Sequence, residues 1–370
     1  MEQQSLLAAL RQAGCSPVEL VGPAGGSAII LPYGARLLAL FTPQGSNLFW
    51  VNPCLRDSAA ATAFFRTTGW RNTGGDRTWI SPERDLHIAD LDDPWNSYQP
   101  TPSIDPGAFT TDVSEGEVRL ATRGQVTHQR LGRSVDVNLE KRLRLVPNPL
   151  RHDPAAQVIL GRVGYVGYEQ MVALSFAEPR TAFRPLIGLW DAIELPAPGE
   201  MLIPTTAAAR VRDFFEPTGT EHLIVSDAGV RFVCDAAQRH KIAVRGTDLP
   251  GGRAAYFSRS ATGADCTLVV RNFALEPSGE YMDTPWDDPQ DRGYVLECYN
   301  DSGINGCYAE LEYHSPAIGE GSGLSSYVDR AQLWGFEGPE ADIAVIMRKL
   351  LGKRLTGELF AAPCGVGGRL

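Results

Sequence analysis

Residues 294–316 read YVLECYNDSGINGCYAELEYHSP and carry the clearest strand pattern in the chain. Two runs rich in aromatic and branched residues flank residues 300–306, which are mostly Asn, Asp, Ser and Gly. Gly tolerates positive φ, and Asn and Asp side chains hydrogen-bond their own backbone, so this middle piece favours a turn. The stretch therefore predicts a β-hairpin with a long loop.

Side chains alternate between the two faces of a strand, which predicts an acidic stripe on the second strand of this hairpin. One face of that strand carries Tyr308, Glu310, Glu312 and His314. On the first strand, Glu297 and Tyr299 share a face. If the loop closes symmetrically, Glu297 lies opposite Glu310, and such a carboxylate pair suits general acid/base chemistry. A solvated sheet face with acidic residues explains the same pattern equally well.

Turn signals separate many further short strands along the chain, with few helices between them. This spacing predicts an all-β fold, a large antiparallel sandwich, rather than alternating β and α units. One predicted strand lies at residues 156–162. Amphipathic patterns predict short terminal helices at 5–13 and 339–353, and an Ala-rich segment predicts another at 58–66. Because no break in composition divides the chain, we expect residues 1–370 to form one domain.

The charge balance argues against nucleic acid as a partner. The 370 residues carry a formal net charge of −10 and contain no run of Lys and Arg, whereas phosphate contacts need a basic patch. The start, MEQQSLLAALRQAG, lacks the features of a signal peptide, and no apolar stretch is long enough to span a membrane. Seven Cys without a CxxC pair indicate reduced thiols. We therefore expect a soluble cytoplasmic protein, with its oligomeric state left open.

A glycine-rich piece at residues 74–83, GGDRTWISPE, supplies the first candidate binding residues. The two glycines permit a bend, after which Arg77 and Trp79 alternate onto one face. Trp can cover the apolar face of a sugar ring while Arg donates hydrogen bonds to its hydroxyls. The alternative is a core Trp beside an Arg that supports a carboxylate such as Glu83.

Three more residues are candidates for catalysis. Asp191 lies within an apolar strand, GLWDAIELP, and is either a catalytic carboxylate or a partner for Arg77. His87 follows in DLHIAD, where a structural role is the commoner outcome for a lone strand histidine. His314 is the stronger candidate, because it shares a face with Glu310 and Glu312.

The sequence gives less support to a metal site than to a sugar-binding site. Four carboxylates crowd one loop beside Trp286, at Asp283, Asp287, Asp288 and Asp291. Their spacing matches no standard calcium loop, so a solvated acidic loop is the favoured interpretation over a Ca²⁺ site. His and Cys residues lack the spacing of a zinc site. The sequence therefore predicts no metal and no cofactor.

Three motifs occur in a fixed order: GGDRTWISPE at 74–83, GLWDAIELPAPGEMLIPT at 188–205 and YAELEYHSPAIG at 308–319. The set resembles an uncharacterised family with the galactose-mutarotase-like β-supersandwich fold, which is distantly similar to aldose 1-epimerases. The resemblance covers about residues 15–340 and implies a sugar-binding cleft on a concave sheet face. The Asn and paired-His motifs of aldose epimerases are not recognisable, so their catalytic positions are not transferred.

Together these features predict a carbohydrate-active enzyme that epimerises an aldose or a related sugar. Arg77 and Trp79 would orient the sugar, with Glu83, Glu297 and Tyr299 as further binding residues. Glu310 or Glu312 would serve as the base and His314 or His87 as the acid.

Two alternatives remain. Glycoside hydrolysis would use Asp191 with a hairpin Glu, at a carboxylate separation of about 5–9.5 Å, and elimination would favour a uronic acid whose carboxylate Arg77 neutralises. A non-catalytic sugar-binding module would bind without turnover.

Overall fold

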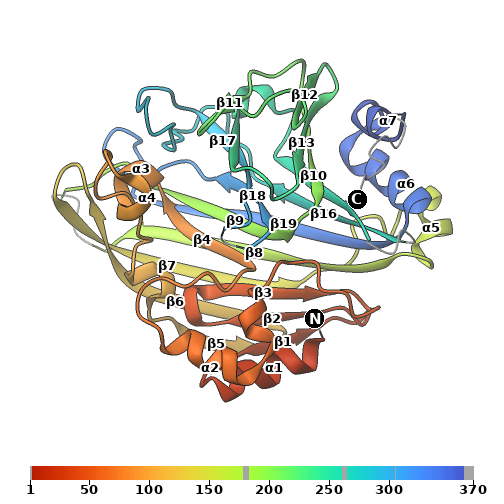
Figure 1. Cartoon of the computed structure of the whole chain (residues 1–370), viewed down its shortest axis with the longest axis horizontal. Coiled ribbons are helices and arrows are strands. Elements are labelled where there is room, and N and C mark those ends of the chain that lie inside the picture. The colour runs from red at the N-terminus through yellow and green to blue at the C-terminus, as the bar shows by residue number, and fades with distance from the viewer. Residues whose placement is uncertain (1, 178–182, 261–264, 305, 362–370) are drawn as a thin grey trace.

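The computed structural model describes residues 2–177, 183–260, 265–304 and 306–361. Asn305 of the predicted hairpin loop lies outside the described residues. Two large antiparallel sheets form the body of the molecule (Figure 1). The predicted all-β sandwich is confirmed.

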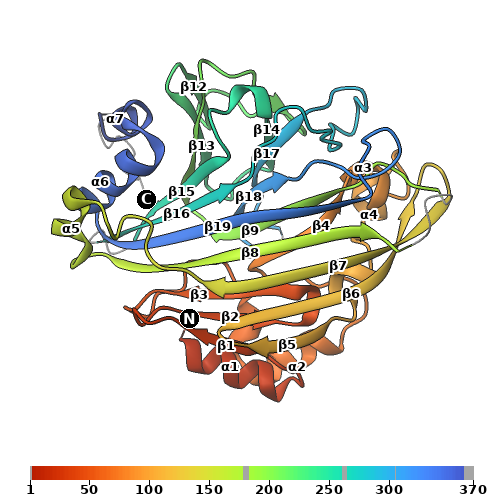
Figure 2. The same cartoon turned by 180° about the vertical axis from the view of Figure 1, so that it is seen from behind.

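Within the described ranges, one sheet has nine strands and the other has ten. The spatial order of the first is β1 (Val18–Val21), β2 (Ser27–Leu31), β3 (Arg36–Phe41), β4 (Asp76–Ser81), β9 (Gly188–Pro196), β18 (Tyr308–His314), β17 (Tyr294–Asn300), β14 (His240–Arg245) and β11 (Arg212–Asp213). That of the second is β12 (Leu223–Ser226), β13 (Gly229–Cys234), β10 (Gly199–Pro204), β15 (Arg253–Arg259), β16 (Asp265–Phe273), β19 (Ser326–Pro339), β8 (Gly164–Phe176), β7 (Arg133–Leu145), β6 (Glu117–His128) and β5 (Thr110–Ser114). Figure 2 shows the long strands β19, β8, β7 and β6 crossing the back of the molecule.

The predicted hairpin is present as β17 and β18, in the half of the nine-stranded sheet that lies beyond β9. Its register differs from the symmetric closure that we expected, because Glu297 pairs with Glu312 and Glu310 pairs with Tyr299. The loop runs on to Cys307, whose φ of 58° is left-handed, so the second strand begins only after it. The pairing therefore moves by two residues. An even shift keeps every side chain on its predicted face.

Apolar residues from the facing surfaces of the two sheets fill the space between them. The nine-stranded sheet contributes Ile30, Leu37, Ile193 and Leu311, and the ten-stranded sheet contributes Tyr168, Val269 and Leu333. All of these side chains are buried, which is the arrangement that two aligned sheets with alternating strands require.

A charged group is buried within this apolar layer. Asp76 of β4 forms an ion pair with Arg271 of β16 at 2.6 Å and lies 3.7 Å from Lys141 of β7. Tyr168 of β8 also donates a hydrogen bond to Asp76. Burial by itself raises the pKa of Asp76, but Arg271 and Lys141 outweigh it and hold the pKa below the usual value. Asp76 therefore connects the nine-stranded sheet to three strands of the other sheet.

Helices cover part of the outer surfaces. The described helices are α1 (Gln3–Gln12), α2 (Ser58–Arg66), α3 (Glu83–Leu86), α4 (Pro94–Ser97), α5 (Pro154–Leu160), α6 (Glu340–Leu351) and α7 (Lys353–Ala361). The predicted helices at 5–13, 58–66 and 339–353 are confirmed as α1, α2 and α6, whereas α7 was not predicted. Figure 1 shows α1 and α2 below β1–β3 and α6 and α7 at one end of the molecule. Among the described residues, every helix is too short or too polar to span a membrane.

The predicted strand at residues 156–162 is wrong, because α5 occupies this segment. Asp153 caps this helix by accepting hydrogen bonds from the backbone N–H groups of Ala155 and Ala156. Pro154 follows at the first helical position, where its fixed φ suits a helix and its missing N–H costs nothing. Asp153 and Pro154 therefore start a helix, although the apolar residues that follow them resemble a strand.

We expect Asp76→Asn to destabilise the protein strongly, because it leaves Arg271 and Lys141 buried without a countercharge. The free energy of unfolding should fall by about 3–5 kcal/mol, measured from urea denaturation curves. Asp112→Asn on the exposed strand β5 is the control and should change it by less than about 0.5 kcal/mol. Equal effects of the two substitutions would contradict the anchoring role of Asp76.

Candidate functional site

A pocket of about 300 Å³ lies on the face of the nine-stranded sheet that points away from the other sheet. The strand pairings align the residues on this face of the sheet, in and beneath the pocket, in three lateral rows. These rows are Glu194–Glu310–Tyr299–Lys241, then Arg77–Ala192–Glu312–Glu297, then Trp79–Trp190–His314. Strands that are far apart in the sequence thus bring charged and aromatic side chains together on one surface.

A larger cavity, of about 660 Å³, lies beside the turn between β1 and β2. Gly, Pro and aliphatic residues make up most of its lining, and its described lining residues include neither a carboxylate nor a histidine. The smaller pocket combines three carboxyl groups, of Glu83, Glu310 and Glu312, with the cations of Arg77 and Lys241, and is therefore the candidate site.

Arg77 lies at the centre of one wall of the pocket. Its Nη1 lies 2.8 Å from Glu194 Oε1 and 2.6 Å from Glu310 Oε1, and its guanidinium stacks 4.2 Å from the ring centre of Trp79. Burial raises the pKa of Glu194 to about 8, although Arg77 opposes the shift. Asp191 and Glu83 were the carboxylate partners that we considered for Arg77. The structure pairs Arg77 with Glu194 and Glu310 instead.

Aromatic rings provide most of the remaining wall. The ring of Trp79 is held in place because its Nε1–H donates a hydrogen bond of 2.7 Å to Asp105. The aromatic residues that line the pocket are Trp70, Trp79, Trp95, Tyr98, Trp190, Phe215, Tyr299 and Tyr308. Glu83 joins two of the surrounding loops, since it accepts hydrogen bonds from Tyr98 at 2.8 Å and Trp286 at 3.1 Å. The pocket thus offers flat apolar surfaces with carboxylates between them.

Lys241 is the second buried cation of the site. Its Nζ lies 2.8 Å from Glu297, 3.2 Å from Glu312 and 3.6 Å from Glu83. Burial raises the pKa of Glu312 to about 8, although Lys241 opposes the shift. Glu297 behaves differently: burial would raise its pKa, but Lys241 and His314 outweigh burial and hold it at about 2.

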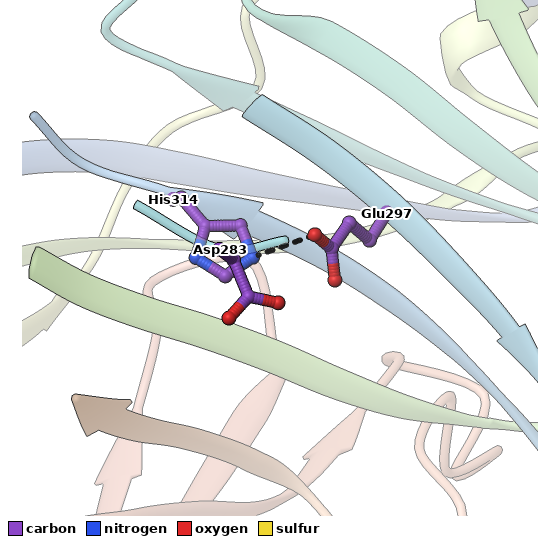
Figure 3. Close-up of side chains that lie close together, drawn as sticks. All are labelled: Asp283, Glu297 and His314. Atoms are coloured by element: carbon purple, nitrogen blue, oxygen red, sulfur yellow. Dashed lines mark ion pairs between the residues drawn. The ribbon is translucent and has the colours of Figure 1, made fainter. Parts of the chain in front are cut away.

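The two histidines predicted as acids do not line the pocket. His87 is stacked between Trp79 and Tyr98, and its Nε2 lies 2.8 Å from the carbonyl oxygen of Ile80. Burial lowers the pKa of His87, which favours its neutral form. His314 is buried beneath the pocket beside Trp190, with Nε2 3.4 Å from Glu297 Oε1 (Figure 3). The geometry therefore does not place either imidazole where it could touch a ligand in the pocket.

Asp191 also lies away from the pocket. As the alternation in GLWDAIELP implies, its side chain points between the sheets, where it accepts hydrogen bonds from Thr78 and from Gln170 of β8. Its proposed pairing with a hairpin glutamate across a glycosidic bond is therefore incompatible with the fold.

The acidic loop at residues 283–291 does not gather its carboxylates around one point. Asp283 accepts a hydrogen bond from the backbone N–H of Glu83, whereas Asp291 pairs with Arg245 and Asp287 lies 3.4 Å from Arg212. This arrangement gives no support to the calcium loop that we considered.

Six of the predicted residues line the pocket: Arg77, Trp79, Glu83, Tyr299, Glu310 and Glu312. Glu297 lies just beneath it. Sequence reasoning missed Lys241, which the strand HKIAVR places on the pocket face, and it gave no role to Glu194. The same strand also carries His240 and Arg245, so no local signal singles out Lys241.

Comparisons with known proteins agree with the fold. A model described as a family of unknown function, DUF6786, matches residues 12–357. A search of curated proteins found no match. Among solved structures, a candidate aldose 1-epimerase from Klebsiella pneumoniae subsp. pneumoniae MGH 78578 aligns with a TM-score of 0.53 and 11% identity, covering 92% of this chain and 85% of that one. Galactose 1-epimerase from Lactobacillus acidophilus NCFM aligns with a TM-score of 0.41 and 10% identity, covering 88% and 95%.

The Klebsiella structure shows that the chain has the galactose-mutarotase-like sandwich fold, as the sequence motifs implied. At 11% identity the likeness extends to the fold alone. The family match covers residues 12–357, and the protein therefore belongs to the family DUF6786.

Proposed function

We propose that the pocket binds a neutral monosaccharide and that Glu310 and Glu312 interconvert its anomers. The observation that carries this proposal is the arrangement of these two carboxyl groups. They lie on one strand, face the same aromatic-lined pocket and have separate cationic partners, Arg77 and Lys241. Mutarotation needs only two positioned proton-transfer groups.

The size and lining of the pocket favour a single sugar ring. Its volume is near the lower end of the range for small-molecule sites, roughly 300–1,000 Å³. Other aromatic residues of the lining, such as Trp70 and Phe215, offer apolar surface for the C–H faces of a sugar, and the carboxylates accept hydrogen bonds from its hydroxyls.

The charges of the pocket favour a neutral ligand over a uronic acid. Arg77 contacts Glu194 and Glu310, and Lys241 contacts three further carboxylates, so both cations already have anionic partners. A ligand carboxylate would have to displace one of these partners while it met the remaining negative charge. This removes the reason to expect elimination of a uronate.

The reaction can be written with these residues alone. Glu310, whose Oε1 lies 2.6 Å from Arg77 Nη1, accepts the proton of the C1 hydroxyl. Glu312 gives a proton to the ring oxygen as the C1–ring oxygen bond breaks, which yields the open-chain aldehyde. Rotation about C1–C2 and reversal of both transfers closes the other anomer. Burial raises the pKa of Glu312 to about 8, so its carboxyl group has a proton to give at neutral pH.

We expect Glu310→Gln and Glu312→Gln each to slow anomer interconversion by about 10²–10⁴-fold, since each removes one proton-transfer group while it preserves shape. Proton NMR of freshly dissolved glucose and galactose measures the rate, and ligand line broadening measures binding, which should persist. Glu117→Gln on β6, in the other sheet, should keep the wild-type rate.

A wild-type protein that binds these sugars without accelerating interconversion would contradict the enzymatic half of the proposal. It would leave a sugar-binding module. Absence of both binding and turnover for every neutral aldose tested would refute the proposal as a whole.

Calorimetric titration tests the preference for a neutral ligand. We expect glucose or galactose to bind at least about tenfold more tightly than the matching uronate, a difference of about 1.4 kcal/mol, because the pocket already holds more carboxylates than cations. Tighter binding of the uronate would show that Arg77 or Lys241 is available to a ligand anion after all.

The protonation of Glu194 decides how firmly Arg77 is held, because a neutral carboxyl attracts a guanidinium less than a carboxylate does. With a folded-state pKa of about 8 against the ordinary 4.5, Glu194 holds a proton that the unfolded chain loses in this interval. The free energy of unfolding should therefore fall as the pH rises from about 4.5 to 8.

Glu194→Gln removes this contribution. Relative to wild type, the variant should gain on the order of 1–3 kcal/mol of stability between pH 5 and pH 9, measured by urea denaturation at both values. Wild-type and variant stabilities that stay parallel across this interval would show that burial does not keep Glu194 neutral.

A further inference from the structure

Three buried side chains beneath the pocket converge on one point. Asp283 comes from the segment before β17, Glu297 from β17 itself and His314 from the end of β18. Figure 3 shows the Asp283 carboxylate and the His314 ring lying close together, with Glu297 pointing toward them. The exposed fraction of each residue is 1% or less. None of the three lines the pocket, so the proposed sugar chemistry does not use them directly.

Each of these side chains has a polar atom without a hydrogen-bond partner. Asp283 uses Oδ1 to accept the backbone N–H of Glu83, which leaves Oδ2 unused. Glu297 directs Oε2 toward Lys241, which leaves Oε1 facing the imidazole. Both ring nitrogens of His314 lack a hydrogen bond. Buried polar atoms without partners are costly, so their convergence calls for a bound species.

Carboxyl groups also surround the cluster on the side of the pocket. Lys241 Nζ lies 2.8 Å from Glu297, 3.2 Å from Glu312 and 3.6 Å from Glu83. Among these described residues the carboxyl groups outnumber the single ammonium, an environment that suits a bound cation.

The distances fit a first coordination shell after small side-chain adjustments. One ligand atom from each residue lies within 4.8 Å of the other two. The separation of 3.4 Å between His314 Nε2 and Glu297 Oε1 already equals that of two ligands about 2.1 Å from a tetrahedral ion. One imidazole nitrogen with two carboxylate oxygens suits Zn²⁺ and related ions, whereas Ca²⁺ and Mg²⁺ prefer oxygen alone.

We propose that Asp283, Glu297 and His314 bind a divalent transition-metal ion of the Zn²⁺ class. The site joins the acidic segment before β17 to the hairpin, and thereby fixes the floor beneath Trp190 and Lys241. It departs from the sequence-based expectation of no metal, because the three ligands follow no recognised spacing. It rests on the cluster alone and is independent of what the pocket binds.

Zinc titration of the chelator-treated, full-length protein tests the site. Calorimetry should give about one Zn²⁺ per chain, and metal analysis after dialysis should recover the same amount. His314→Gln and the near-isosteric Asp283→Asn should each weaken binding by at least about tenfold. His87→Gln, which changes another buried histidine outside the cluster, should bind as wild type does. Zn²⁺ should also raise the Tm of wild type but not of Asp283→Asn.

Three results would overturn the proposal: wild type retaining no more zinc than His314→Gln, binding that Asp283→Asn leaves unchanged, or retention of Ca²⁺ in preference to Zn²⁺. The first would mean that an imidazolium held between two carboxylates satisfies the cluster without a metal. Sugar binding measured on the same samples separates this outcome from failure of the pocket proposal.

Discussion

The ion pair between Asp76 and Arg271 determines where the pocket lies, because adjacent residues of β4 serve opposite faces of one sheet. Asp76 points between the sheets and is held there at 2.6 Å by a guanidinium of the other sheet. The next residue, Arg77, must then point outward, where it contacts Glu194 and Glu310. A slip of β4 by one residue would bury the wrong charge and remove the pocket cation in a single step. The inter-sheet anchor therefore also sets the register of the site.

The same alternation explains why charged and aromatic side chains lie together on one face of the sheet while apolar side chains lie on the other. On β18, Leu311 and Tyr313 face the core while Glu310 and Glu312 face the pocket. Buried ion pairs contribute little net stability, since desolvation offsets their attraction. We therefore attribute their concentration on one face of the sheet to the proposed ligand site rather than to folding. The apolar residues that alternate along each strand therefore set the architecture, and the polar residues between them set the chemistry of the site.

The sequence predicts which face of the sheet each side chain of a strand occupies. It does not predict which residues of distant strands are in contact. The faces of Glu310, Glu312, Arg77 and Trp79 follow from local alternation alone. The contact between Arg77 and Glu310 joins residues 233 positions apart, and no local pattern specifies it. The hairpin register was missed because it depended on one loop residue.

Other features had still weaker signals. Lys241 looked like one lysine in an ordinary strand, and its role appears only when β14 is placed beside β17. Trp95 of α4 and Phe215, which follows β11, also line the pocket but lie outside the strands, so strand alternation does not predict them. The strand pattern at 156–162 failed because the helix-starting pair Asp153 and Pro154 outweighed the apolar run that follows.

The floor of the pocket combines two demands that conflict electrostatically. Carboxyl groups that transfer protons to and from a sugar must be close together and shielded from water, yet each additional buried carboxylate raises the cost of ionising the others. Lys241 can neutralise only one of its three neighbours. A cation held one layer deeper, at Glu297 and His314, would lower that cost without occupying the space that a ligand needs. The carboxyl groups around Lys241 and the buried cluster beneath them can therefore be understood as one electrostatic unit, in which the proposed cation offsets the negative charge of the pocket.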